Sequence, residues 1–143
     1  MKKILVIGAT GMLGQPVVGE LLKAGFSVTA LVRNEHRAQQ LLPDEVSLFR
    51  GDLRNPIDIE QALEGMEGVY LNLSVRPGER RTGFHTENEG LQTLLPLARA
   101  AGIQRIGYLA SLVQHYQGMD NFNWWVFDLK QRATRLIRES GIP

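Results

Sequence analysis

Short apolar runs alternate with amphipathic segments along the whole chain, and this alternation predicts strands and helices in turn. Strands are expected at residues 4–7, 27–32, 46–49, 69–73 and 106–110. Helices are expected at residues 16–23, 35–42, 56–63, 85–101 and 126–140. Because parallel strands need crossover connections, the intervening helices supply right-handed units between them. The pattern therefore predicts the α/β class, with a doubly wound parallel sheet of strand order 3-2-1-4-5.

A glycine-rich turn joins the first expected strand to the first expected helix. Residues 8–14 read GATGMLG, a GxxGxxG spacing. Gly8 permits the tight turn, Gly11 leaves room for a pyrophosphate against backbone N–H groups, and Gly14 lets the helix pack close to the sheet. The positive end of the helix dipole then faces the phosphates. The alternative to dinucleotide binding is a generic glycine-rich turn. The dinucleotide-binding residues predicted here are Gly8, Thr10, Gly11, Met12, Leu13 and Gly14.

The end of the second expected strand bears on which dinucleotide binds. An NAD site usually has an acidic residue there, which holds the ribose 2′-hydroxyl. This chain has Arg33 at that point and Arg37 shortly after it. An arginine forms charge-assisted bonds with a 2′-phosphate, which a carboxylate would repel. We therefore expect Arg33 and Arg37 to favour NADP(H), with NAD(H) as the alternative because Glu35 also lies within reach of the ribose.

Composition and charge narrow the functional classes. The chain has 143 residues, of which 43% are hydrophobic and 22% charged, as in ordinary globular domains. Its formal net charge of +1 excludes the basic excess of a dedicated nucleic-acid-binding domain, and the lack of cysteine excludes disulfides, cysteine-based metal sites and a cysteine nucleophile. No segment approaches the ~18 apolar residues of a membrane span, and the first residues lack the long apolar region of a signal peptide. We expect a cytoplasmic protein with no nucleic-acid or membrane partner, and no metal because no acid–histidine cluster has ligand spacing.

Further motifs follow the glycine turn in order along the chain. They are Leu31-Val32-Arg33-Asn34, Gly51-Asp52-Leu53-Arg54, Asn88-Glu89-Gly90, Tyr108-Leu109-Ala110-Ser111, and Lys130 with the ending Glu139-Ser140-Gly141-Ile142-Pro143. Together they resemble the NmrA-like members of the atypical short-chain dehydrogenase/reductase family along the whole chain. The resemblance implies an NAD(P)-binding Rossmann fold in which Asp52, with Leu53 beside it, holds the adenine amino group. It also implies that Lys130 contacts the nicotinamide ribose.

The chain departs from that family at its catalytic pair. The family's Tyr-x-x-x-Lys motif places its lysine at Lys130 and its tyrosine at Val126, and valine cannot act as an acid or a base. The charge of Lys130 then remains to stabilise a developing oxyanion, unless this lysine simply lies on the helix surface. Many NmrA-like proteins share this loss; some reduce quinones, dyes or enones, and others bind the cofactor without turnover.

Other candidates lie at the carboxyl ends of the last strands, where open α/β sheets bind ligands. Leu73 and Ser74, at the end of the fourth expected strand, are expected beside the nicotinamide ribose. Ser111, after the fifth strand, either bonds a substrate carbonyl or caps the next segment. Tyr116 or the nearby His115 is a candidate proton donor, the alternative being that both are surface loop residues. The catalytic candidates are Lys130, Ser111 and Tyr116.

These features favour an NADPH-dependent oxidoreductase that passes hydride to a small apolar or quinone-like acceptor, since quinones need little acid–base help from the protein. The alternative is a non-catalytic NADP-binding redox sensor or regulator, which the valine at position 126 favours. A nucleotide-sugar epimerase or dehydratase needs the tyrosine and fits less well. A small-molecule substrate is the expected partner, and a homo-oligomer is compatible with the sequence.

The glycines that end helices also bear on domain organisation. Gly25 and Gly102 follow helices and lead into strands, and Gly141 is placed in the same way just before the chain stops at Pro143. A sheet that stops at its fifth strand leaves an edge open. We therefore expect residues 1–143 to form one NAD(P)-binding Rossmann domain, the amino-terminal part of a longer chain that is truncated before a sixth strand and a carboxyl-terminal substrate region.

Overall fold

A five-stranded parallel sheet forms the centre of the computed structural model, which describes residues 1–143. The strands are β1 (Lys3–Ile7), β2 (Ser27–Val32), β3 (Ser47–Arg50), β4 (Gly68–Leu71) and β5 (Arg105–Tyr108). Their order is β3-β2-β1-β4-β5, and all neighbouring pairs are parallel. At the outer edge of β5, the Ile106 N–H donates to the Pro143 carbonyl at 2.8 Å, so the carboxyl-terminal residue lies along that edge. The predicted α/β class and strand order are confirmed.

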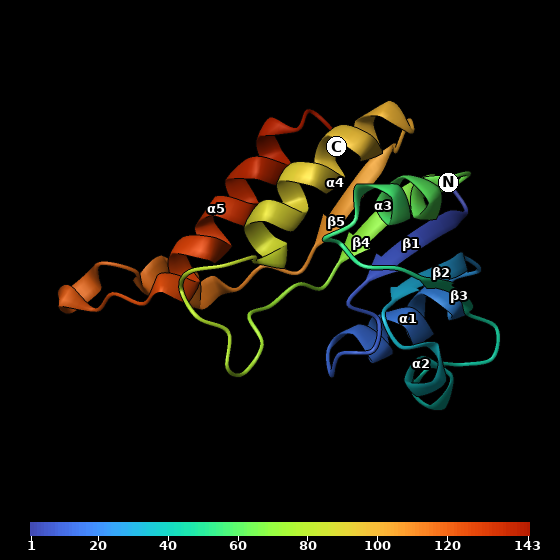
Figure 1. Cartoon of the computed structure of the whole chain (residues 1–143), viewed down its shortest axis with the longest axis horizontal. Helices are drawn as coiled ribbons and strands as arrows, with labels where there is room; N and C mark the ends of the chain where they lie inside the picture. The colour runs from blue at the N-terminus through green and yellow to red at the C-terminus, as the bar shows by residue number, and fades with distance from the viewer.

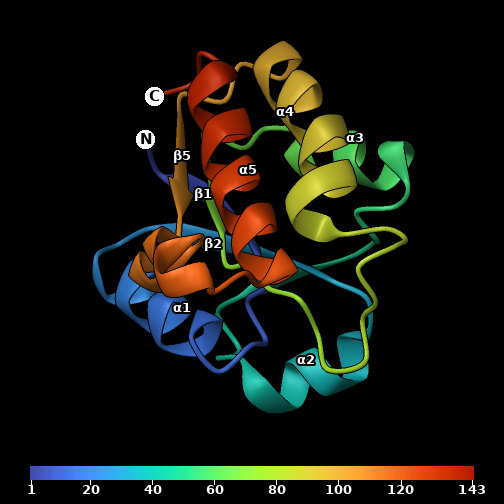
Figure 2. The same cartoon turned by 90° about the vertical axis from the view of Figure 1, so that its left-hand side faces the viewer.

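Helices cover both faces of this sheet, as Figures 1 and 2 show. They are α1 (Gly14–Lys23), α2 (Glu35–Leu41), α3 (Pro56–Leu63), α4 (Leu91–Ala100) and α5 (Trp125–Glu139). The first two lie on one face and the other three on the opposite face, which is the doubly wound arrangement. None of these helices combines the length and the apolar character needed to cross a lipid bilayer.

Each face of the sheet packs against its own apolar cluster. Leu5 and Ile7 of β1 belong to the cluster shared with α3, α4 and α5, whereas Ile4 and Val6 belong to the cluster shared with α1 and α2. All four side chains are at most 5% exposed. Burial on both faces explains why the first strand is an unbroken apolar run rather than an alternating one.

Two strands end earlier than their apolar runs suggest. The sequence pattern extends β4 to residue 73 and β5 to residue 110, but the strands end at Leu71 and Tyr108. The Asn72 N–H still donates to the Ile7 carbonyl at 2.9 Å, and the Leu109 N–H to the Leu71 carbonyl at 3.0 Å. The chain leaves the sheet just after these bonds, so the residues that follow lie at its carboxyl edge.

The helix expected at residues 85–101 begins with a wider turn. Residues Thr86–Gly90 form a π-helical turn, η1, in which the Gly90 N–H donates to the His85 carbonyl, five residues earlier, at 3.2 Å. The following helix α4 runs on through Pro96 without a break, although proline has no N–H to donate. After β5 the chain forms two short 3₁₀ turns, η2 (Leu112–Tyr116) and η3 (Met119–Asn121). Turns this short have no repeating pattern, so the sequence predicts only a loop there.

Candidate functional site

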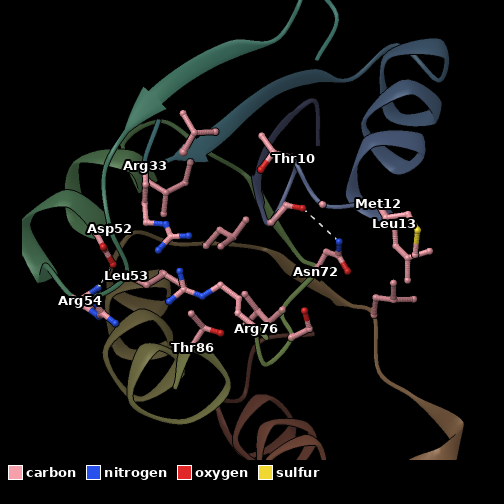
Figure 3. Close-up of a pocket in the computed structure, with 18 of the residues that line it drawn as sticks. Thr10, Met12, Leu13, Arg33, Asp52, Leu53, Arg54, Asn72, Arg76 and Thr86 are labelled. Carbon is pink, nitrogen blue, oxygen red and sulfur yellow. Dashed lines mark hydrogen bonds between the residues drawn. The ribbon is translucent and has the colours of Figure 1, made fainter. Parts of the chain in front are cut away.

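A cavity of about 560 Å³ lies along the carboxyl ends of all five strands (Figure 3). Its walls come from the turn after β1, the ends of β2 and β3, the loop after β4, the end of β5 and one lysine of α5. The strand order reverses between β1 and β4, so the cavity occupies the switch point at which open α/β sheets bind ligands.

The turn after β1 is built so tightly that only glycine fits at two of its positions. Gly8 has a φ of +85°, and a Cβ there would lie 2.0 Å from the Asn72 carbonyl oxygen. A Cβ on Gly14 would lie 2.1 Å from the Gly8 carbonyl oxygen. The side-chain amide of Asn72 also donates to that Gly8 carbonyl, at 3.3 Å, and Figure 3 shows this bond. The end of β4 therefore holds the turn against the start of α1.

The same turn offers backbone donors to an anion. The N–H groups of Met12 and Leu13 precede α1 and donate to no acceptor within the protein. Both residues line the cavity, together with Thr10 and the exposed Gly11. Free amides at a helix amino terminus attract phosphate groups, because the helix dipole adds a partial positive charge. This region fits the pyrophosphate of a dinucleotide.

The β2 and β3 side of the cavity is rich in arginine. Arg33 follows β2 and forms no ion pair with the protein, and Figure 3 shows the Arg76 side chain crossing the cavity toward it. Arg76 is held by Glu79, whose Oε1 lies 2.9 Å from the arginine Nε. Arg54 lies 5.2 Å from the centre of the Phe84 ring. The only carboxylate among the lining residues is Asp52, so this end of the cavity favours an anionic group.

Asp52 is oriented by its own loop. Its N–H donates to the Asp58 carboxylate at 2.9 Å, and its Oδ1 accepts the Arg54 N–H at 2.9 Å. The carboxylate is thereby fixed at the edge of the cavity, where it can accept a hydrogen bond from an amino group.

The β4 and β5 side of the cavity is organised around Lys130. This α5 side chain is only 12% exposed. Its Nζ donates to the Leu73 carbonyl at 2.7 Å and forms an ion pair with Glu87, whose Oε1 lies 2.6 Å away. Ser74 and Ser111 line the same region. Val126, one helical turn before the lysine, is buried and does not line the cavity. Lys130 is therefore a buried cation at the cavity wall rather than a free surface lysine.

The structure brings most of the sequence-predicted site residues together. The cavity is lined by Gly8, Thr10, Gly11, Met12, Leu13, Arg33, Asp52, Leu53, Leu73, Ser74, Ser111 and Lys130. Four candidates lie outside the lining, namely Gly14, Arg37, Tyr116 and the neighbouring His115. Gly14 lies beneath the turn, and Tyr116 is 58% exposed in η2. Arg37 lies in the first turn of α2, where its N–H donates to the Asn34 side chain. No group of three or more histidine and acidic side chains is placed to hold a metal.

Sequence reasoning missed several residues of the site. Asn72 had a usable signal, because it is a polar residue near the carboxyl end of the otherwise apolar strand expected at residues 69–73. Phe84 lies in a polar loop without periodicity and Thr86 begins the turn η1, and only the folded chain places them at the cavity. Arg76 lies in the loop before them, where the sequence favours a solvated side chain and leaves contact with a cofactor phosphate as the alternative. Glu87 is 1% exposed, yet its sequence neighbours are polar.

His85 fastens the loop after β4 to the rest of the protein. Its ring is 5% exposed, packs 5.3 Å from the Trp125 ring, and lies 3.2 Å from Glu79 Oε2 and 3.1 Å from the Arg81 carbonyl oxygen. Since both partners only accept, both ring nitrogens must donate, which requires the charged imidazolium. Burial alone lowers the pKa of His85, but the bonds to Arg81 and Glu79 and the nearby acidic charges outweigh burial and raise it.

We expect the stabilising effect of His85 to be larger in weak acid than in weak base. Because the folded-state pKa of His85 is raised, its contribution is complete below the unfolded value and is lost as the pH rises through the folded value. Bonds from Arg76 and His85 lower the pKa of Glu79 despite its burial, so that carboxylate stays ionised throughout. The melting temperatures of the wild type and His85→Gln should therefore differ more at about pH 5.5 than at about pH 8.5. A difference that is constant or grows with pH would contradict a charged His85.

A sequence comparison connects this geometry to known proteins. The profile of a family described as NAD(P)H-binding matches residues 8–143. A curated relative, sterol demethylase protein B of Methylococcus capsulatus, is 36% identical over 128 residues, which cover 85% of this chain and 39% of the relative.

Solved structures share the fold. The triphenylmethane reductase of Citrobacter sp. has a TM-score of 0.76 and 26% identity, with 99% of this chain and 46% of that chain covered. An NADPH-dependent quinone oxidoreductase of Escherichia coli, solved with NADPH, has a TM-score of 0.75 and 26% identity, with 97% of this chain and 46% of that chain covered. The chain thus spans less than half the length of these proteins, and the expected NAD(P)-binding Rossmann fold is confirmed.

Proposed function

This chain belongs to the NAD(P)H-binding family, and on that premise we propose that it is an NADPH-dependent oxidoreductase that passes hydride to a small apolar or quinone-like acceptor. One observation carries the proposal. A single cavity joins an arginine-rich end, the amides of the glycine turn and the buried Lys130, in the order that a dinucleotide needs.

The preference for NADPH rests on the arginine-rich end. On the β2 side of the glycine turn, Arg33 takes the place where NAD sites usually carry an acid. Arg76 reaches the same region from the loop after β4. Charge-assisted bonds from guanidinium groups match a 2′-phosphate, and the carboxylate of Asp52 is left for the adenine.

The acceptor class rests on what lines the other end. A bound nicotinamide cofactor supplies the hydride there. No tyrosine or histidine side chain lines the cavity, so the chain's donors near that end are the Lys130 ammonium and the hydroxyls of Ser74 and Ser111. An acceptor that takes its proton from water, such as a quinone, suits this wall, and the two reductases that share the fold are named for a quinone and a dye.

A second candidate is a non-catalytic NADPH-binding regulator. Val126 favours it, because the buried valine leaves no acid or base at the position that the resemblance assigns to tyrosine. The two candidates share the binding site and differ only in turnover.

We expect the purified chain to bind NADPH and to oxidise it when quinones or triphenylmethane dyes are added. The loss of nicotinamide absorbance measures the reaction, and the quenching of tryptophan fluorescence measures binding. Lys130→Met should slow oxidation, whereas Lys23→Met, a surface lysine on α1, should not. NADPH binding without oxidation across the panel would contradict the oxidoreductase and support the regulator, and a lack of NADPH binding would contradict both.

A further inference from the structure

A buried carboxylate pairs with Lys130. Glu87, in the π-helical turn η1, is 1% exposed. Its Oε1 accepts the Tyr108 hydroxyl at 2.7 Å and lies 2.6 Å from Lys130 Nζ, while its Oε2 is buried without a partner. Burying a carboxylate away from water costs free energy. Tyr108 and Lys130 offset that cost for Glu87. The chemistry proposed so far does not use Glu87.

The geometry points to Glu87 as a positioning residue, which holds the Lys130 ammonium so that one N–H bond is directed at the nicotinamide half of the cofactor. This inference rests on the proposed function and identifies the residue that orients Lys130 in that site. An ammonium has three N–H bonds; one donates to the Leu73 carbonyl, and the charge pairs with the Glu87 carboxylate. Because Lys130 also lines the cavity, an N–H bond of its ammonium remains available to a ligand.

Tyr108 fixes the carboxylate in turn. Burial, together with the charge and the hydrogen bond of Glu87, raises the pKa of Tyr108 far above its usual range. The hydroxyl therefore stays protonated and donates to Glu87, and it does not replace the tyrosine missing at position 126. Tyr108 also does not line the cavity, so it acts on the site only through Glu87.

Neighbouring acids do not share this role. Glu89, two residues along the same turn, accepts the His85 N–H at 2.8 Å and the Asn88 side-chain amide at 2.7 Å. Glu79 pairs with Arg76 and His85. Glu87 is thus the acid that pairs with Lys130.

The inference is tested by comparing two ligands on one variant. Glu87→Gln keeps the shape of the side chain and removes its charge. We expect it to weaken NADPH binding about tenfold to 100-fold, the effect of losing one charge-assisted hydrogen bond. Adenosine 2′,5′-bisphosphate has no nicotinamide half, so its affinity should stay within about twofold. Lys130→Met should give the same pattern, and the double variant should bind NADPH no more weakly than either single one.

Glu89→Gln is the matched control, since glutamine can still accept the His85 N–H, and its NADPH affinity should match the wild type. Equal weakening of both ligands by Glu87→Gln would show a general structural role, and wild-type NADPH affinity would show no role; either result overturns the inference. A wild-type chain that binds neither ligand would instead contradict the proposed function.

A second measurement needs no cofactor and does not depend on a fully stable single variant. If Glu87 and Lys130 form a buried ion pair, each single replacement leaves an unpaired buried charge, and the double variant removes both charges. Glu87→Gln/Lys130→Met should therefore melt at a higher temperature than either single variant. A double variant less stable than both would overturn the pairing on which the positioning role depends.

Discussion

Replacing Gly11 with aspartate is expected to abolish NADPH binding while the fold remains intact. Gly11 is exposed in the turn, and a Cβ there would lie 3.3 Å from the Asn72 side-chain nitrogen and the Gly8 carbonyl oxygen, a tight but tolerable fit. The new carboxylate would stand beside the free amides of Met12 and Leu13. The carboxylate would repel the pyrophosphate of the cofactor. Two like charges about 4 Å apart near a protein surface repel by about 4 kcal/mol, which corresponds to roughly a 1,000-fold loss of affinity.

The control for this change lies on the helix that follows the turn. A Cβ on Gly19 of α1 meets nothing within 4 Å, so Gly19→Asp adds the same charge without touching the cavity. Its NADPH affinity, measured by calorimetry, should stay near that of the wild type. If Gly11→Asp melts like the wild type and still binds NADPH tightly, then the cofactor does not lie on the glycine turn.

The order of strands and helices was predictable because each element carries a local signal. The continuous apolar run at Ile4–Ile7 reflects burial on both faces, and Asn55 followed by Pro56 marks the start of α3, where the Asn55 side chain accepts the Ile57 N–H at 3.1 Å. The ends of β4 and β5 were not predictable in this way. Their apolar runs continue past the last strand residue, because the next side chains are used to line the cavity rather than to extend the sheet.

The residues of the site likewise fall into those that the sequence could predict and those that it could not. The glycine turn and Arg33 could be read locally, since a backbone that must approach a phosphate needs glycine and a 2′-phosphate needs a cation. The Glu87–Lys130 ion pair joins residues that are 43 positions apart in the sequence. The hydrogen bond from Lys130 to the Leu73 carbonyl joins residues that are 57 positions apart. No sequence pattern encodes such pairs, so a buried acid in a polar stretch is indistinguishable from a solvated one until the chain is folded.

Arg33→Asp is expected to reverse the preference between NADPH and NADH. Arg33 lines the cavity directly after β2, is exposed, and pairs with no acid of the protein. The change removes charge-assisted bonds worth about 1.5–3 kcal/mol and adds repulsion toward a 2′-phosphate, so NADPH affinity should fall roughly 100-fold. NADH should gain affinity, because an acid at the end of the second strand accepts a bond from the ribose 2′-hydroxyl. Titration of both cofactors by fluorescence quenching gives the ratio.

Arg37→Asp provides the comparison, since it makes the same change of charge one turn away. The Asn34 side chain caps α2 by accepting the Arg37 N–H, and the Arg37 side chain does not line the cavity. A screened charge at that distance should weaken NADPH binding only a few-fold and leave NADH unaffected. Equal losses of NADPH affinity from both substitutions would mean that the arginine-rich end attracts the cofactor through its overall positive potential. A reversal confined to Arg33 would mean that this one guanidinium, supported by Arg76 from the opposite wall, contacts the phosphate.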